Sequence, residues 1–193
     1  RAFELLKSDD YSGALRCAVA ILKRSGPDAA MRVLAAEACR GLGRYDRAAE
    51  HFSRALELDP GKPELLFGRA LCRWKLSSYR EALSDFTKDR LAGADPDAVE
   101  YWSVLCRCRL NQDGPELLES IQELLRLRPA VPELMFALGE ALYRSERPDL
   151  ARGWFDRTLQ ADPDQEMAAL YRISCGESLR DLEGTLRAYD DYL

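Results

Sequence analysis

The sequence predicts an all-α fold in which antiparallel helix pairs stack as a solenoid. Three observations predict it: a period of 34 residues along the chain, helical spacing within each period, and prolines at regular joints. A column of mostly small residues recurs at Ala14, Ala48, Ala82, Leu117, Ala151 and Thr185, with one extra residue between the third and the fourth. A second, mostly aromatic column lies four residues later, at Ala18, Phe52, Phe86, Ile121, Phe155 and Tyr189. Residues four apart share one face of a helix, so each period contains a helix that buries both columns.

The predicted helices are about 12 to 15 residues long, which is too short for stability alone in water. Their apolar stripes must therefore be covered by neighbouring helices. Pro60, Pro129 and Pro163 mark the joints between units, and turn residues such as Gly43 and Ser77 separate the two helices of a unit. Helix pairs stacked in this way form a solenoid with a concave and a convex side.

Taken in order, the expected units of one solenoid over 1–193 are 1–28, 29–62, 63–97, 98–131, 132–165 and 166–193. Counted back from Ala14, the first helix of the first unit begins before Arg1, and the last unit ends within its second helix. Solenoids usually need polar capping elements, and neither end supplies an obvious one. We therefore expect both terminal units to be truncated and the chain to be a fragment of a longer protein.

Unit 29–62 resembles the tetratricopeptide repeat, which is a helix, a tight turn and a second antiparallel helix. The resemblance rests on Ala36, Tyr45, Ala48, Phe52, Ala55 and Pro60, and the segment RYDRAAEHFSRALELDP is close to the family consensus. Unit 132–165 matches independently through Leu138, Gly139, Tyr143, Ala151, Phe155 and Pro163. Unit 98–131 departs from the pattern at Leu117 and Ile121, where we expect a local change in helix packing. The resemblance covers nearly the whole chain and implies about five to six units in a right-handed superhelix.

In this family the first helix of each pair lines a concave groove, and the resemblance places the inward residues by their position in the unit. The implied groove residues are Val33, Glu37, Arg40, Phe67, Leu71, Trp74, Lys75, Trp102, Cys106, Arg109, Phe136, Glu140, Tyr143, Arg144 and Leu170. Aromatic side chains with nearby arginines are enriched where proteins bind proteins. The resemblance therefore implies a groove for a peptide or helical segment of another protein, and its basic residues suit an acidic or amphipathic partner.

A structural explanation of the same residues remains open. The large aromatic side chains at Phe67, Trp74, Trp102 and Phe136 are also expected if they pack between adjacent helices. The basic residues Arg40, Lys75, Arg109 and Arg144 lie in the last turns of their helices, where the helix dipole favours positive charge.

Some co-chaperones of this family hold the acidic C-terminal tails of heat-shock chaperones with a clamp of lysines, an arginine and asparagines. The single asparagine of this chain, Asn111, lies outside that pattern. The places of the clamp asparagines hold Glu37 and Gly68. We therefore do not expect a standard carboxylate clamp.

The composition limits the other classes of function. A formal net charge of -5 does not favour general binding to nucleic acid or to anionic membranes. No apolar run approaches the roughly 20 residues that span a bilayer, so we expect no membrane insertion. The only histidine, His51, argues against a site built from several imidazoles, and no nucleophile with an acid–base partner or glycine-rich phosphate loop is present. We expect no enzymatic activity, no cofactor and no metal site.

The cysteines are Cys17, Cys39, Cys72, Cys106, Cys108 and Cys175, an even number that is compatible with disulfides. All of them fall within helical patterns, in a chain large enough to bury a core without covalent cross-links. Cys106 and Cys108 project toward different faces of a helix and cannot readily share a metal. Buried free thiols in a reducing compartment are the better interpretation, and they predict a cytoplasmic protein.

The leading hypothesis from the sequence is a non-enzymatic scaffold or adaptor that binds a partner protein in its concave groove. Two alternatives stay open. One is a self-association module that uses the solenoid ends or the convex face. The other is the substrate-recruiting arm of a larger enzyme.

Overall fold

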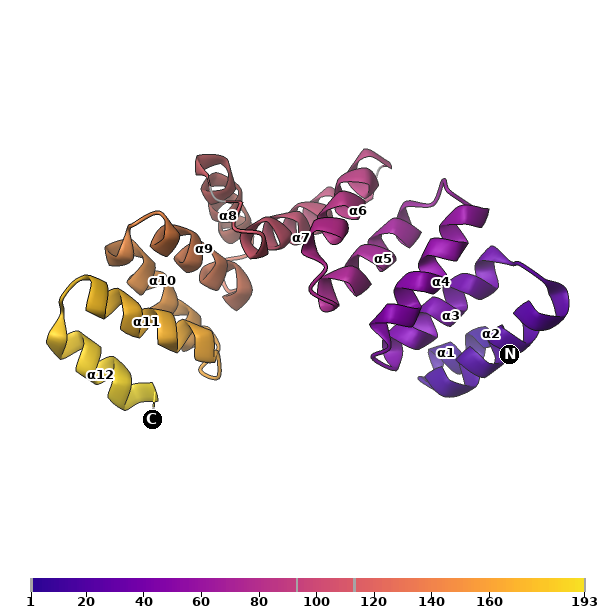
Figure 1. The fold of residues 1–193 in the computed structure, drawn as a ribbon, viewed down its shortest axis with the longest axis horizontal. Helices are drawn as coiled ribbons and strands as arrows, with labels where there is room; N and C mark the ends of the chain where they lie inside the picture. The colour runs from indigo at the N-terminus through magenta and orange to yellow at the C-terminus, as the bar shows by residue number, and fades with distance from the viewer. Residues whose placement is uncertain (1, 93, 113, 193) are drawn as a thin grey trace. The chain divides into compact units, whose positions relative to one another are not determined.

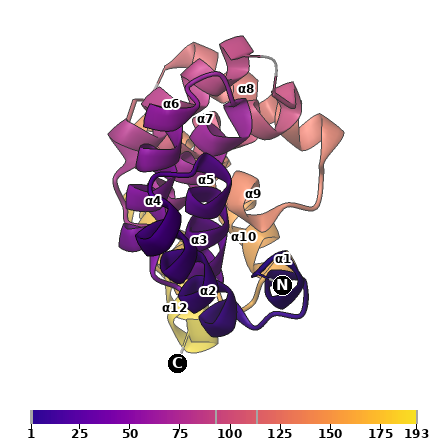
Figure 2. The same ribbon diagram turned by 90° about the vertical axis from the view of Figure 1, so that its right-hand side faces the viewer.

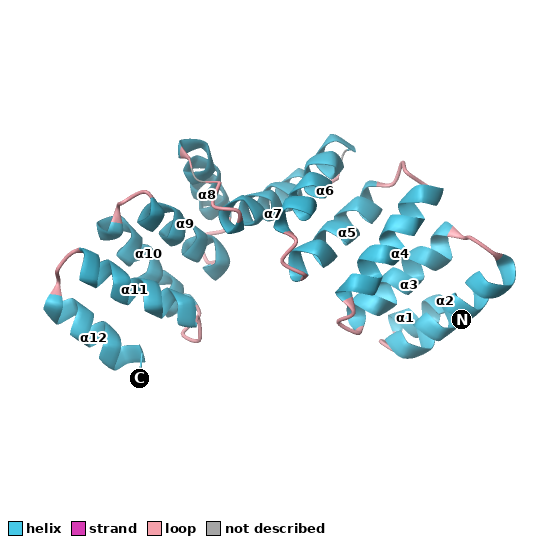
Figure 3. Cartoon of the chain, in the orientation of Figure 1, coloured by secondary structure: helices cyan, strands magenta, loops and turns pink. Residues whose placement is uncertain are grey.

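The computed structural model of the chain describes residues 2–92, 94–112 and 114–192, and only the backbone of residues 88–92. Every regular element within those ranges is an α-helix (Figure 3). The helices are α1 (Ala2–Lys7), α2 (Tyr11–Ser25), α3 (Ala29–Gly41), α4 (Tyr45–Leu58), α5 (Pro63–Lys75), α6 (Tyr79–Ala92), α7 (Pro96–Arg109), α8 (Pro115–Leu127), α9 (Pro132–Arg144), α10 (Pro148–Ala161), α11 (Glu166–Ser178) and α12 (Leu182–Tyr192). The predicted all-α stack of helix pairs is confirmed. Among the described helices, none has the length and apolar character to cross a membrane.

The chain divides into two compact units, Arg1–Cys106 and Arg107–Leu193. Each helix packs on the next one along the chain, from α1 to α6 in the first unit and from α8 to α12 in the second (Figures 1 and 2). First helices of consecutive pairs also touch, α1 with α3 and α9 with α11. The division falls inside α7, in the part of the sequence where the repeat departs from the consensus.

The turns within helix pairs repeat one backbone conformation. A residue with positive φ occurs in the turn after each first helix, at Asp9, Gly43, Ser77, Asn111, Glu146 and Arg180. Only Gly43 is a glycine, and glycine adopts this left-handed conformation without steric cost. These positions are 34 residues apart, except that Asn111 and Glu146 are 35 apart.

The second helices bury the aromatic column of the repeat except at its last member, Tyr189, which is 44% exposed. Phe52, Phe86 and Phe155 are 1%, 0% and 0% exposed, as their place in the period predicts. First helices come close to two of these rings, Phe52 and Phe155, because they carry glycine at the contact. A Cβ atom on Gly68 would lie 2.6 Å from Cζ of Phe52, and one on Gly139 would lie 2.6 Å from Cε1 of Phe155. At these two places an aromatic ring packs directly against a helix backbone.

Candidate functional site

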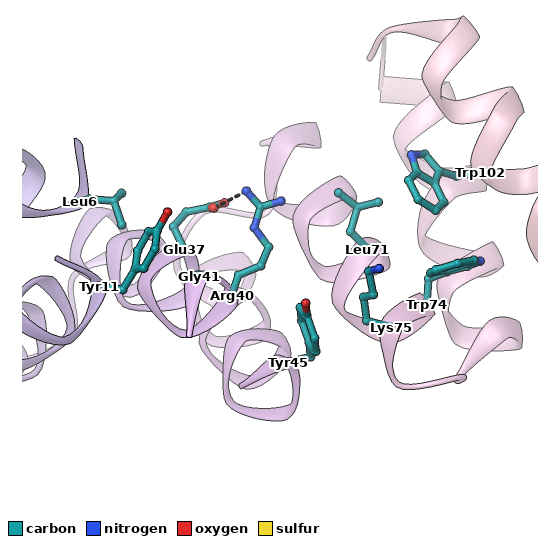
Figure 4. A pocket seen from close by; sticks show the side chains of 10 residues that line it. All are labelled: Leu6, Tyr11, Glu37, Arg40, Gly41, Tyr45, Leu71, Trp74, Lys75 and Trp102. Atoms are coloured by element: carbon teal, nitrogen blue, oxygen red, sulfur yellow. Dashed lines mark ion pairs between the residues drawn. The ribbon is translucent and has the colours of Figure 1, made fainter. Parts of the chain in front are cut away.

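The first unit contains a cavity of about 510 Å³ (Figure 4). It is lined by Leu6, Tyr11, Glu37, Arg40, Gly41, Tyr45, Leu71, Trp74, Lys75 and Trp102. Its volume lies within the range of about 300–1,000 Å³ that is usual for ligand sites. Six of the implied groove residues meet here: Glu37, Arg40, Leu71, Trp74, Lys75 and Trp102.

Helical spacing explains why these side chains converge. On α3, Glu37 and Arg40 are three residues apart, and on α5 Leu71 lies three and four residues before Trp74 and Lys75. Residues with these separations share one helix face. Each first helix therefore presents a short stripe to the same cavity, and Trp102 on α7 extends it.

Aromatic rings form one end of the cavity. The rings of Trp74 and Trp102 meet edge to face with centroids 5.1 Å apart. Trp102 also stacks on the buried ring of Phe86, with centroids 6.3 Å apart and an interplanar angle of 10°. Because Phe86 is fully buried, it fixes the orientation of Trp102. The cavity thus has a rigid apolar wall, which loses little side-chain entropy when a ligand packs on it.

Charged groups lie beside this wall. Arg40 Nη2 is 2.6 Å from Glu37 Oε2, and both side chains are partly exposed, at 40% and 29% (Figure 4). The ammonium group of Lys75 lies 5.4 Å from the centroid of the Trp74 ring, which is a cation–π distance. The charged side chains of the cavity are therefore two cations and one carboxylate.

Sequence reasoning missed four lining residues: Leu6, Tyr11, Gly41 and Tyr45. The two tyrosines begin second helices, and the Tyr11 ring lies against Gly41 at the end of α3. Gly41 allows this approach, because a Cβ atom there would lie 2.5 Å from Cδ1 of Tyr11. A regular column of tyrosines, at Tyr11, Tyr45 and Tyr79, was the available signal.

Tyr11 is held in place by its own turn. Its hydroxyl donates a hydrogen bond of 2.5 Å to Oδ1 of Asp9. This bond raises the pKa of the Tyr11 hydroxyl above its usual value, and the negative charge of Asp9 raises it further. The hydroxyl therefore stays protonated at neutral pH and fixes the direction of the ring.

Three other implied groove residues of the first unit lie in its core or pack against it. Cys106 is fully buried with Phe86, Val99 and neighbouring apolar side chains. Val33 and Phe67 are half-buried, and the Phe67 ring meets Phe86 edge to face at 5.5 Å. None of these three side chains lines the cavity.

In the second compact unit, Arg107–Leu193, most of the implied groove residues form a packed cluster. Phe136 is 3% exposed, and its ring centroid lies 5.8 Å from Phe155 and 5.9 Å from Tyr171. The Tyr143 ring meets Tyr171 at 5.5 Å. Leu170, by contrast, is 41% exposed on α11. The aromatic side chains of this cluster therefore mainly contact one another.

A buried carboxylate lies at the centre of this cluster. Glu140 is 8% exposed, and its oxygens lie 3.4 Å from Nη1 of Arg109 and 3.9 Å from Nη1 of Arg144. The Arg109 guanidinium also covers the Phe136 ring at 5.7 Å. Burial raises the pKa of the Tyr171 hydroxyl, and the nearby charge of Glu140 raises it further. The two arginines compensate the charge of a carboxylate that has little contact with solvent.

The single histidine lies on α4, outside the cavity. His51 is half-buried, with Nδ1 3.4 Å from Nη1 of Arg32. Burial lowers the pKa of its imidazole, and the charge of Arg32 lowers it further. His51 is therefore packed against a cation and contributes nothing to the cavity lining.

Comparison with known proteins identifies the family. The tetratricopeptide repeat family matches residues 1–63, 40–99 and 118–166, and the chain belongs to this family. The predicted resemblance is therefore confirmed. The fold is generally a module for protein–protein interaction, and no catalytic family is indicated.

Relatives of known name share parts of the chain. Tetratricopeptide repeat protein 13 of Homo sapiens is 28% identical over 140 residues, which is 68% of this chain and 16% of that protein. The Protein SGT1 homolog of Bos taurus is 31% identical over 80 residues, which is 41% of this chain and 23% of that protein. Tetratricopeptide repeat-containing protein trd-1 of Caenorhabditis elegans is 27% identical over 84 residues, covering 43% and 11%. The chain thus spans less than a quarter of each relative.

Solved structures share the fold. YrrB, described as a TPR protein with an unusual peptide-binding site, has a TM-score of 0.66 and 22% identity, covering 91% of this chain and 90% of that one. PilW, described as a widely conserved type IV pilus biogenesis factor, has a TM-score of 0.70 and 19% identity, covering 97% and 86%. These similarities show the architecture alone.

Proposed function

We propose that this chain is a non-enzymatic interaction module that binds a peptide or helical segment of a partner protein in the cavity of its first unit. The observation that carries the proposal is the cavity itself, where six of the implied groove residues converge on a rigid aromatic wall. Clustered tryptophan, tyrosine and arginine side chains are the residue types that dominate binding energy at protein interfaces. YrrB, which shares the fold, is described as having a peptide-binding site, and this supports the same class of ligand.

The shape of the lining favours a segment of chain over a compact small molecule. Side chains come from α1, α2, α3, α4, α5 and α7, so the cavity runs across successive helix pairs. A peptide or a partner helix can place several side chains along such a path, one on each helix pair. The burial of Cys106 and Phe136 leaves them little surface for a ligand, and the docking surface proposed here excludes them.

The test uses a random peptide library displayed on phage and selected on the 193-residue chain. Selected peptides are then measured by fluorescence anisotropy on the unaltered chain and on Trp102→Ala. The matched control is Trp154→Ala, because Trp154 is a half-buried tryptophan of α10 that also lies under a cation, Arg157, at 4.6 Å. A smaller change in the cavity, Tyr45→Ala, guards against a loss of folding in Trp102→Ala.

We expect Trp102→Ala to weaken binding about tenfold or more, as loss of an interface anchor does. Tyr45→Ala should weaken it less, and Trp154→Ala should leave it unchanged. Circular dichroism and thermal unfolding establish that each variant is folded. Selected peptides that bind all folded variants equally would show that the cavity is not the binding site.

A further inference from the structure

We propose that the partner segment carries acidic side chains between two apolar anchors. We also propose that Glu37 competes with a carboxylate of the partner for Arg40. The inference rests on the proposed function and names the chemistry of the partner. The cavity lining carries two cations, Arg40 and Lys75, and one carboxylate, Glu37. An acidic segment complements this balance, and a basic one would face two like charges.

The order of the lining residues gives the order of anchors in the partner. Leu6 and Tyr11 lie on one side of α3, and Leu71, Trp74 and Trp102 lie on the other side (Figure 4). The Glu37–Arg40 pair occupies the middle, because α3 packs between α2 and α4. A complementary segment therefore places apolar side chains at both ends and acidic side chains between them.

The Glu37–Arg40 pair is built so that a ligand can replace it. The two residues are three apart on one helix and both are partly exposed, and such pairs are weak. Arginine holds an incoming carboxylate through two parallel hydrogen bonds. Glu37 then lies close to the new carboxylate and repels it. The unaltered chain should therefore bind an acidic segment less tightly than a chain without this negative charge.

Lys75 adds the second contact. Its ammonium group lies over the Trp74 ring, so the positive charge is held beside the apolar wall. Among the described residues, no carboxylate lies within ion-pair distance of Lys75, and its charge is available to a ligand. A carboxylate of the partner can therefore reach Lys75 while an apolar anchor packs on the wall, if the two lie one helical turn or one strand step apart in the partner.

The probes are three short peptides with blocked ends, each with leucines flanking a central pair of aspartates, asparagines or lysines. Blocked ends exclude recognition of a terminal carboxylate. Fluorescence anisotropy is measured on the full 193-residue chain, on Glu37→Gln and on Lys75→Gln. The matched control is Glu50→Gln, which removes the same charge from another exposed glutamate–arginine pair, with Arg54, on α4 and outside the cavity.

We expect the aspartate peptide to bind most tightly and the lysine peptide most weakly. Glu37→Gln should raise affinity for the aspartate peptide about threefold, which is the usual size of an exposed ion pair, and should leave the asparagine peptide unchanged. Lys75→Gln should lower affinity for the aspartate peptide by a similar factor. Glu50→Gln should change neither, and added salt should weaken the aspartate peptide selectively.

Equal binding of the three peptides, or no binding of any, overturns the inference. So does a Glu37→Gln variant that binds the aspartate peptide no better than the control variant does. Failure of the inference is distinct from failure of the proposed function. Library peptides that require Trp102 but are neutral or basic overturn the acidic partner alone, whereas the absence of any peptide that requires Trp102 overturns both.

Discussion

Arg69 holds the buried carboxylate of Asp85 through two hydrogen bonds, from Nε to Oδ2 at 2.8 Å and from Nη2 to Oδ1 at 2.7 Å. Asp85 is 1% exposed on α6, and Arg69 lies on α5. Arg73 pairs with the same carboxylate, and Nη1 of Arg69 donates to Oγ of Ser53 on α4 at 3.2 Å. One guanidinium therefore links three consecutive helices, α4, α5 and α6.

Removing this carboxylate should destabilise the first unit. We expect Asp85→Ala to lower the free energy of unfolding by about 3 kcal/mol, because Arg69 is then buried without its partner. Urea unfolding followed by circular dichroism measures the change. Replacing all three charged groups, as Arg69→Met and Arg73→Met with Asp85→Leu, should recover much of the loss, since no charge of this cluster is left without its partner. A loss below about 1 kcal/mol in Asp85→Ala would mean that solvent reaches Arg69.

Glycine is required where a first helix meets a buried ring. Gly68→Ala and Gly139→Ala should each destabilise the fold by about 1–2 kcal/mol, because the new methyl group overlaps Phe52 or Phe155. Gly153 on α10 is the matched control, since a Cβ atom there meets no heavy atom within 4 Å. Gly153→Ala should stabilise by up to about 1 kcal/mol through helix propensity. Thermal unfolding of the three variants checks the sign, and equal effects at all three sites would contradict the packing.

His51 should make stability depend on pH between about 5 and 7. Its pKa is lowered in the folded chain by burial and by Arg32, so the unfolded chain binds a proton more readily. Stability is therefore present above the unfolded pKa of about 6.5 and decreases as the pH falls through that value. Because the chain has one histidine, His51→Gln should remove this decrease from thermal unfolding curves. An unchanged slope in His51→Gln would assign the dependence to carboxylates.

The buried thiols should resist alkylation. Burial raises the pKa of Cys72 to about 11 and that of Cys175 to about 11, so the reactive thiolate is scarce near neutral pH. Cys17 is the half-buried thiol, and the other five are buried. We expect iodoacetamide to modify Cys17 first, with Cys72 and Cys175 protected until the chain is denatured. Peptide mass spectrometry resolves the sites, and rapid labelling of Cys72 would indicate frequent opening of α5.

Helix positions could be predicted from the sequence because the period fixes both helices of each pair. Phe52 and Phe155 recur at the same place in the repeat and occupy the same buried position. The division of the chain into two compact units inside α7 was harder to predict from the sequence. Leu117 and Ile121 signalled a departure from the pattern, but the extent of contact between neighbouring helices depends on side-chain shapes that the period does not encode.

The cavity was only partly predictable, as two equivalent glutamates show. Glu37 and Glu140 hold the same position in their repeats, yet Glu37 lines an open cavity and Glu140 is 8% exposed. Arg109 from α7 and Arg144 from α9 flank Glu140, and the Tyr171 ring lies beside it. Glu37 pairs with Arg40 of its own helix. The difference arises from residues on neighbouring helices, which a position within one repeat cannot specify.

The left-handed turn in each helix pair offers a way to adjust hairpins one at a time. Ser77, Glu146 and Arg180 hold φ values of 60°, 58° and 55°, which cost a non-glycine residue roughly 1–2 kcal/mol, whereas Gly43 adopts its φ of 70° freely. These residues are exposed and lie at hairpin tips. Replacing one of these residues by glycine would stabilise the chosen hairpin. The effects on the free energy of unfolding at well-separated tips should add. Such substitutions would change the order in which the hairpins open, without altering any side chain of the cavity.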